Sequence, residues 1–220
     1  MARGRKPQAP DASRRSELLR AAARLFVEKG FDATTTRDIA EAVGMRSGSP
    51  FYHFRSKQEL LKAAMIGGLE AGAERLRATT AAIADPEARL RAMVRAHLGN
   101  LLEGECPAPM LLGETRALDA AERAEIAAAF DSYQRPWQDV LEQLAAAGTL
   151  ASAAPPTRLL LFGMLNWTTQ WYRADGPLSL DELAESCVAL LLGRAPKAPG
   201  TAPPETSERR NAGNTERNTS

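Results

Sequence analysis

The stretch TTTRDIAEAVGMRSGSPFYHFRSKQELLK, residues 34–62, decides the fold of this chain. Thr35 with Asp38 three residues later is the pattern of a capping box, so we expect a helix to begin there. The apolar stripe of this short helix consists of Ile39, Ala40 and Val43. Gly44 is expected to end it, because glycine adopts a left-handed helix stop at little cost.

Residues 46–53 are predicted to form a second short helix. Its small residues, Ser47, Gly48 and Ser49, would let it lie deep in a groove. Pro50 fits within the first turn, where its missing N–H would have no intrahelical partner. This order of two short helices around a glycine is typical of a helix-turn-helix whose second helix enters the DNA major groove. The alternative is an ordinary helical hairpin.

An aromatic run follows this second helix. Phe51 and Phe54 are expected to anchor it to its own core, which leaves Tyr52 and His53 facing outward. Ser56 with Glu59 then forms a second predicted capping box, which opens a long helix.

These residues resemble the DNA-binding domain of the TetR family of bacterial repressors. Residues 14–34 are similar to the family's first helix and connecting turn, and the run 51–57 is similar to its motif after the recognition helix. Arg46 stands where the family usually has serine or threonine, and Pro50 where it usually has leucine or isoleucine. Both departures bear on which bases are read, and neither threatens the fold.

Charge is distributed unevenly along the chain, although the total is only +1. Residues 1–62 hold 13 Lys and Arg against 7 Asp and Glu, whereas residues 63–195 hold 11 against 17. A basic end attracts DNA phosphates, and an acidic body discourages binding in the wrong orientation. The leader with Arg3 and Arg5 is of the kind that enters an A·T-rich minor groove. A basic leader that adds only nonspecific affinity is an equally open alternative.

The residues expected at the DNA differ in role. Tyr52 and Lys57 are predicted to hold phosphates, while Ser47, Ser49 and His53 approach base edges. The full set of predicted DNA-binding residues is Arg3, Arg5, Thr35, Thr36, Arg37, Arg46, Ser47, Gly48, Ser49, Tyr52, His53 and Lys57.

A chain of 220 residues can hold one helical DNA-binding unit and one larger domain. Because no strand-like alternation persists anywhere, the predicted fold class is all-α, with an N-terminal three-helix helix-turn-helix domain and a C-terminal helical ligand-binding and dimerisation domain. We expect a flexible basic arm at 1–12, the DNA-binding domain at 13–62, the helical domain at 63–194 and a disordered tail at 195–220.

Several function classes are disfavoured. The chain has no glycine-rich phosphate loop and no nucleophile elbow, so we predict no enzyme, no cofactor and no metal site. It has no signal peptide and no apolar run long enough to cross a bilayer, so we expect a cytoplasmic protein without a membrane partner. Cys106 and Cys187 suit reduced thiols. A redox switch through them is a further alternative, although Cys187 lies on an apolar face, where a thiol is usually inert.

The helices of the larger domain follow from apolar spacing and caps. One is expected between Pro86 and the loop 106–109, with His97 on its apolar face as a core histidine. Its other apolar positions are Leu90, Met93, Val94, Leu98 and Leu101. Asp119 and Glu122 open a long helix, which Pro136 should kink and Gly148 should end.

Two late helices indicate a partner. Leu159–Tyr172 is apolar on nearly all sides and so should be buried on more than one side, and Ser179 with Glu182 opens a last amphipathic helix. In the TetR family the last two helices form a four-helix dimer interface, and residues 159–172 and 180–192 fall where those helices belong. Two recognition helices about 34 Å apart are what a palindromic operator requires. A monomer whose last helices bury each other is the alternative.

The larger domain carries a narrower resemblance. The runs GETRALDAAERAEI (113–126) and FGMLNWTTQWYRADGPLSLDELA (162–184) are similar to a TetR subgroup that represses fatty-acid and steroid degradation genes. The resemblance implies an acyl-coenzyme A inducer. Within those runs it suggests Arg116, Asn166, Trp167, Trp171 and Arg173 as ligand-binding residues. Helical face adds Arg95, Phe130, Tyr133 and Trp137.

These candidates divide between the two ends of such a ligand. Arg95, Arg116, Arg173 and Trp171 would meet the polar end, and Phe130, Tyr133, Trp137 and Trp167 would line an acyl tunnel. Each has a structural alternative: the aromatic residues could be core or dimer contacts, and the arginines could pair locally or cap helices. Drugs, aromatic compounds and lactones are alternative inducers.

The predicted mechanism is repression controlled by a ligand. Ligand would enter between the long helices and, through the helix with Pro136 or its neighbours, shift the helix that begins at Ser56. That movement would change the separation of the two DNA-reading heads.

Overall fold

The computed structural model describes residues 10–45, 54–102 and 108–196, without side-chain detail at 10–13 and 108–112. Every regular element in these ranges is a helix, which confirms the all-α prediction. The α-helices are α1 (Pro10–Lys29), α2 (Thr36–Ala42), α3 (Lys57–Thr80), α4 (Pro86–Leu102), α5 (Ala120–Ala146), α6 (Pro155–Trp167) and α7 (Leu180–Leu191). The described ranges also contain the 3-10 segments η2 (Ala108–Ala117) and η3 (Thr168–Gln170).

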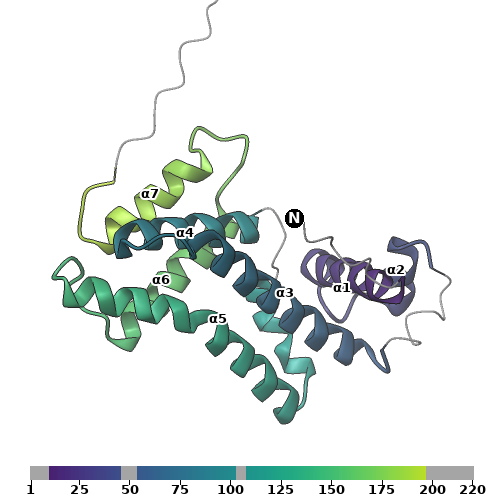
Figure 1. Cartoon of the computed structure of the whole chain (residues 1–220). Coiled ribbons are helices and arrows are strands. Elements are labelled where there is room, and N and C mark those ends of the chain that lie inside the picture. The colour runs from purple at the N-terminus through teal and green to yellow at the C-terminus, as the bar shows by residue number, and fades with distance from the viewer. Residues whose placement is uncertain (1–9, 46–53, 103–107, 197–220) are drawn as a thin grey trace, which may run out of the picture.

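The long helix α3 connects two parts of the molecule. α1 and α2 form a small unit at one end, and α4 to α7 form a larger body at the other (Figure 1). α3 packs against α1 in the small unit and against α4 and α5 in the body. It passes through residues 62 and 63 as one helix. The predicted boundary between residues 62 and 63 therefore falls inside a helix that belongs to both parts.

One continuous hydrophobic core runs through both parts. Phe26 of α1, Leu60 and Met65 of α3, and Trp137 of α5 all belong to it, and all are almost fully buried. The apolar stripe predicted for α4 is confirmed, because every one of its positions is buried, including His97.

Helix caps form largely as the sequence predicts. Complete capping boxes open α2 at Thr35, α5 at Asp119 and α7 at Ser179. The box expected at Ser56 is only half formed. The Ser56 hydroxyl accepts from the backbone N–H of Glu59 at 3.0 Å, but the Glu59 carboxylate accepts from the backbone N–H of Arg55 at 2.7 Å.

The helix expected over Leu159–Tyr172 is wrong in its bounds. α6 begins at Pro155 and ends at Trp167, and the chain then tightens into η3. Two hydroxyls explain the early end: Thr168 donates to the carbonyl of Leu165 at 2.7 Å, and Thr169 donates to that of Asn166 at 2.9 Å. Such side-chain bonds compete with continued helix.

α6 buries one side in the single protomer. Leu161, Phe162 and Leu165 face the core, but Leu160 is 73% exposed and Trp167 is 67% exposed. These exposed side chains agree with the expected partner, and burial of α6 on more than one side stays a prediction about the dimer.

Two further features concern α5 and the segment before it. α5 continues through Pro136 to Ala146, and Gly148 follows with a φ of +72°, which confirms the expected stop. The kink at Pro136 stays a prediction. η2 begins within the loop expected at 106–109 and extends to Ala117, where no regular element is predicted.

Candidate functional site

The described part of the helix-turn-helix is built around α2. Thr34 fixes its approach, because its buried hydroxyl donates to the carbonyls of Leu25 at 3.1 Å and Gly30 at 2.8 Å. The Thr35 backbone and hydroxyl donate to the Asp38 carboxylate, both at 2.8 Å, and these bonds lower the pKa of Asp38.

The predicted DNA contacts on α2 lie at its exposed start. Thr35 and Arg37 are exposed and Thr36 is half-buried. The Arg37 guanidinium donates to Glu41 at 2.8 Å on the same helix. Its role at the DNA stays a prediction. Eight predicted contacts lie outside the described residues: Arg3, Arg5, Arg46, Ser47, Gly48, Ser49, Tyr52 and His53.

Lys57 ties the first turn of α3 to the end of α1. Its ammonium group donates to the carbonyls of Phe31 at 2.7 Å and Thr34 at 3.0 Å. It also lies 4.3 Å from the centre of the Phe31 ring. These contacts assign Lys57 a structural role in the turn between α1 and α2. Its predicted phosphate contact stays a prediction beside that role.

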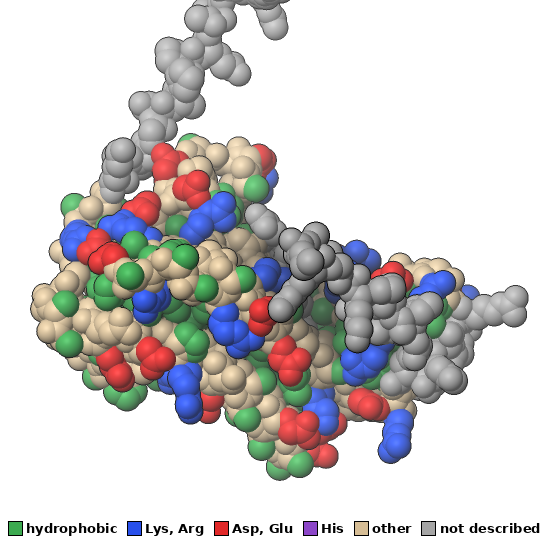
Figure 2. Space-filling model, in the orientation of Figure 1, with side chains coloured by type: hydrophobic (Ala, Val, Ile, Leu, Met, Phe, Trp, Pro, Cys, Tyr) green, Lys and Arg blue, Asp and Glu red, His purple; other side chains and the backbone are tan. Residues whose placement is uncertain are grey.

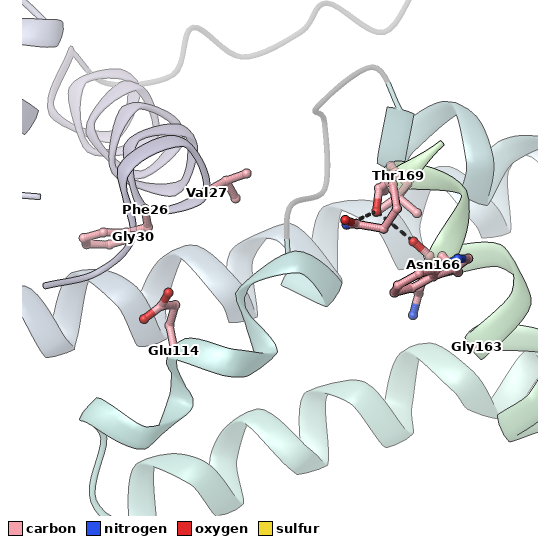
Figure 3. Close-up of a pocket in the computed structure, with 10 residues that line it drawn as sticks. Phe26, Val27, Gly30, Glu114, Gly163, Asn166 and Thr169 are labelled. Atoms are coloured by element: carbon pink, nitrogen blue, oxygen red, sulfur yellow. Dashed lines mark hydrogen bonds between the residues drawn. The ribbon is translucent and has the colours of Figure 1, made fainter. Parts of the chain in front are cut away.

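A pocket of about 410 Å³ lies between the carboxyl end of α1 and the junction of α6 with η3 (Figure 3). It therefore touches the small unit and the larger body together. Its lining residues are Phe26, Val27, Gly30, Leu101, Glu114, Gly163, Asn166, Trp167, Thr169 and Gln170.

The end of α1 shapes one wall of this pocket. Gly30 ends the helix with a φ of +83°, a backbone conformation that glycine adopts without strain. A Cβ atom at that position would lie 3.9 Å from Oε1 of Glu114. Figure 3 shows the Glu114 carboxylate pointing from η2 towards this end of α1.

The opposite wall carries an amide held from behind by a buried histidine. Nε2 of His97 lies 3.1 Å from Oδ1 of Asn166, and Nδ1 lies 2.8 Å from the hydroxyl of Tyr133. Burial lowers the pKa of His97 to about 4, so the imidazole is neutral at physiological pH. A neutral imidazole uses one nitrogen as donor and the other as acceptor, which suits these two partners.

The structure brings two of the predicted ligand residues, Asn166 and Trp167, to the pocket. Tyr133 and Trp137 are instead core residues around His97 and Phe162. Phe130 is half-buried, and Trp171 is 51% exposed beyond the end of η3. None of these last four lines the pocket.

The three predicted arginines also lie away from the pocket lining. Arg95 is ion-paired with Asp181, Arg173 pairs with Asp175 at 3.2 Å, and Arg116 donates to the carbonyl of Gly113 at 3.1 Å. In this conformation the three arginines make local contacts, which is the alternative to ligand binding. Their contact with a ligand stays a prediction.

Several pocket residues escape sequence reasoning. Val27 and Gly30 belong to the DNA-binding unit, and Glu114 sits on a 3-10 segment that no periodicity indicates. Glu114 lies in the run 113–126, so the resemblance could have suggested it as a pocket residue. Nothing in the sequence around Val27 indicates that it lines a pocket.

The described part of the chain gives no support to metal or redox chemistry. No group of three or more His, Cys, Asp or Glu residues there could hold a metal ion. Cys187 is buried, and burial raises the pKa of its thiol to about 11, so the reactive thiolate is scarce. Cys106 lies outside the described residues. No described helix is both long and apolar enough to span a membrane.

Comparisons with known proteins agree with this architecture. The family model described as "Bacterial regulatory proteins, tetR family" matches residues 18–64, and "Tetracyclin repressor-like, C-terminal domain" matches residues 83–194. The transcriptional repressor KstR2 of Mycobacterium tuberculosis is 32% identical over 186 residues, which cover 82% of this chain and 92% of KstR2.

Solved structures extend the likeness. AibR, in complex with isovaleryl coenzyme A and operator DNA, has a TM-score of 0.73 and 27% identity over 82% of this chain and 99% of AibR. The structure of the ketosteroid transcriptional regulator KstR2 of Mycobacterium tuberculosis has a TM-score of 0.67 and 28% identity over 84% and 95%. A chain called superantigen pfit has a TM-score of 0.69 and 38% identity over 85% and 91%.

Family models thus match both parts of the chain. The match to the repressor KstR2 covers most of the length of both proteins. The chain belongs to the TetR family of bacterial transcriptional regulators.

Proposed function

We propose that this chain represses transcription as a dimer on a palindromic operator and leaves the DNA when an acyl-coenzyme A occupies the pocket between α1 and α6. The observation that carries the ligand part is the pocket itself, because Val27 of the DNA-binding unit and Asn166 of the larger body line the same space. The likeness to AibR, solved with isovaleryl coenzyme A and operator DNA, supports this ligand class.

The DNA-reading part of the proposal rests on the helix-turn-helix. Ser47, Ser49 and His53 would approach base edges, and Tyr52 and Lys57 would hold phosphates. The basic arm with Arg3 and Arg5 would add contacts in the minor groove. Operator DNA requires a cytoplasmic protein, and we place the chain there.

The dimer is proposed to form through α6 and α7. Large apolar side chains on these helices and on the adjoining segment meet solvent in the single protomer, which supports a covering partner. They are Leu159, Leu160, Trp167, Trp171 and Leu190. A two-fold axis there would hold two reading heads about 34 Å apart, as a palindromic operator requires.

A short route connects the pocket to the DNA-reading unit. Gly30 and Phe31 follow one another at the end of α1, and Lys57 binds the carbonyl of Phe31. A ligand that moves the end of α1 would therefore also move the start of α3 and the turn that leads into α2. The sequence predicts instead that the ligand shifts α3 through α5, which contains Pro136. That second route stays a prediction.

The ligand must distinguish two states of the protein. It can release DNA only by binding the released form more tightly than the DNA-bound form, with a typical coupling of about 1–3 kcal/mol. Direct contact with α1 provides such a difference, because the shape of the pocket changes when that helix moves.

The test is operator release. The full-length protein is bound to its own upstream DNA and challenged with a panel of acyl-coenzyme A thioesters, the matching free acids and free coenzyme A. Release by one class of thioester, but not by its acid or by free coenzyme A, is the expected result. DNA binding that no thioester disturbs would reject the acyl-coenzyme A ligand and leave a TetR regulator of another inducer class, such as a drug, an aromatic compound or a lactone.

A further inference from the structure

Glu114 is the one charged side chain among the described residues that line the pocket. It lies half-buried on η2, with its carboxylate directed at the end of α1 (Figure 3). Its neighbour Arg116 is directed elsewhere, because the Arg116 guanidinium donates to the carbonyl of Gly113 at 3.1 Å. Within the described part of the chain, no ion pair or hydrogen bond involves the Glu114 side chain.

The end of α1 is a second source of negative potential near this carboxylate. The carboxyl end of a helix carries a partial negative charge, and α1 ends at the pocket wall. Two cations contact the segment around that end, and neither is ion-paired with Glu114: Lys29 pairs with Asp38 at 3.7 Å, and Lys57 donates to the carbonyls of Phe31 and Thr34. Among the described residues, Glu114 therefore contributes the charge of the pocket lining, and that charge is negative.

We propose that Glu114 determines specificity by admitting uncharged acyl groups and excluding ionised free acids. The proposal deepens the proposed function, since it concerns the ligand of the same pocket. A thioester has no charge at its carbonyl carbon, and its phosphates lie at the far end of a long neutral arm. The matching free acid carries a full negative charge directly at the end of the acyl chain.

The size of the pocket makes this discrimination effective. A carboxylate bound in this pocket of about 410 Å³ would share its lining with Glu114. Salt screens the repulsion of two charges only partly when they lie closer together than the Debye length of about 8–10 Å. The Asn166 amide on the opposite wall offers hydrogen bonds to a neutral carbonyl, so removing the charge keeps that interaction.

The experiment compares octanoate with octanamide, which differ in charge but hardly in size. Their affinities for the full-length protein are measured by the fluorescence of its tryptophans, of which Trp167 lines the pocket. Wild type should bind the amide at least about tenfold more tightly than octanoate, because the octanoate charge is repelled by the like charge of Glu114. Glu114→Gln, which keeps the size and an acceptor oxygen, should bring that preference close to one.

The control is Glu142→Gln, which removes the same charge from an exposed position on α5 outside the pocket lining. It should keep the preference of wild type. An unchanged preference in Glu114→Gln would overturn the proposal. So would failure of both ligands to bind wild type and Glu114→Gln, because the pocket would then not admit an acyl chain.

Operator release by octanoyl-coenzyme A is measured separately on the same proteins. If the thioester does not release DNA while Glu114→Gln still abolishes the charge preference, the proposed inducer class fails and the role of Glu114 stands. The two outcomes therefore separate the specificity of the pocket from its regulatory use.

Discussion

Nε2 of His97 lies 3.1 Å from Oδ1 of Asn166, so a fully buried imidazole on α4 positions a polar group of the pocket wall on α6. The other ring nitrogen lies 2.8 Å from the Tyr133 hydroxyl on α5. Three helices of the larger body are thus joined by one neutral histidine. The core and the pocket share this contact, so changes at His97 should be visible in stability and in ligand binding.

Stability should fall in mild acid because His97 is buried in its neutral form. Its pKa is about 4 in the folded protein against 6.5 for an ordinary histidine, so the unfolded chain takes up the proton first. The free energy of unfolding should decrease as pH falls from about 6.5 to 4.5, by about 2–3 kcal/mol. Urea unfolding at several pH values measures this.

His97→Gln supplies the comparison, because glutamine does not titrate. Its free energy of unfolding should vary less with pH over the same range. Lowered carboxyl pKa values, such as that of Glu87 at about 2, act mainly below pH 4.5 and leave this window clear. Parallel pH dependence in wild type and His97→Gln would rule out the histidine as the cause.

Tyr133→Phe should weaken the same network without removing bulk. The hydroxyl that bonds to His97 would be lost in a buried site, at a cost of about 1 kcal/mol in the free energy of unfolding. Tyr172→Phe is the matched control, since Tyr172 is only half-buried and should lose less than about 0.5 kcal/mol. Equal losses in the two variants would contradict the role of the Tyr133 hydroxyl.

The helices of this fold can be predicted from the sequence more fully than the contacts that line its pocket. The caps at Thr35, Asp119 and Ser179 and the buried stripe of α4 depend on spacing within one helix, so they could be predicted. The end of α6 could not, because two threonine hydroxyls override an apolar pattern that favours more helix.

The pocket depends on helices far apart in the sequence. Val27 and Asn166 meet across it only because α1 packs beside η2 and the larger body, and no pattern within either helix encodes that meeting. Arg95 and Arg173 are expected at the ligand from helical face and resemblance. In this structure they pair with Asp181 and Asp175, so their contact with a ligand stays a prediction.

Lys57→Ala should reduce both stability and DNA affinity. Its ammonium group holds two backbone carbonyls of the turn after α1, and such charged hydrogen bonds contribute about 1.5–3 kcal/mol. Under conditions in which the variant is fully folded, its affinity for all DNA sequences should fall by the same factor, because neither the turn nor a phosphate contact reads bases.

Lys29→Ala is the control for lost charge in the same unit. Its ion pair with Asp38 is largely exposed, so the free energy of unfolding should change by less than about 1 kcal/mol. A change of sequence preference in Lys57→Ala, seen in binding to operator variants, would contradict the assigned roles.

Leu160→Glu tests the proposed dimer surface. Leu160 is 73% exposed on α6, so the substitution should leave the protomer folded while placing a charge in the interface. Light scattering should show a monomer, and operator affinity should fall with it. Ala127→Glu, at an exposed position on α5, should remain a dimer. A dimer that survives Leu160→Glu would place the interface elsewhere.

The central claim is that the inducer acts from the pocket between α1 and α6. Its most direct test is to measure how a thioester releases the operator from the Val27→Phe variant, in which the larger side chain fills the pocket from the DNA-binding side. The operator affinity of the full-length variant is measured by fluorescence anisotropy while the thioester that releases wild type is titrated. We expect the variant to bind DNA as wild type does but to need at least about tenfold more thioester, a loss of about 1.4 kcal/mol in ligand binding. Val27→Ala should still respond. Release of Val27→Phe at the wild-type concentration would show that the inducer acts from another site.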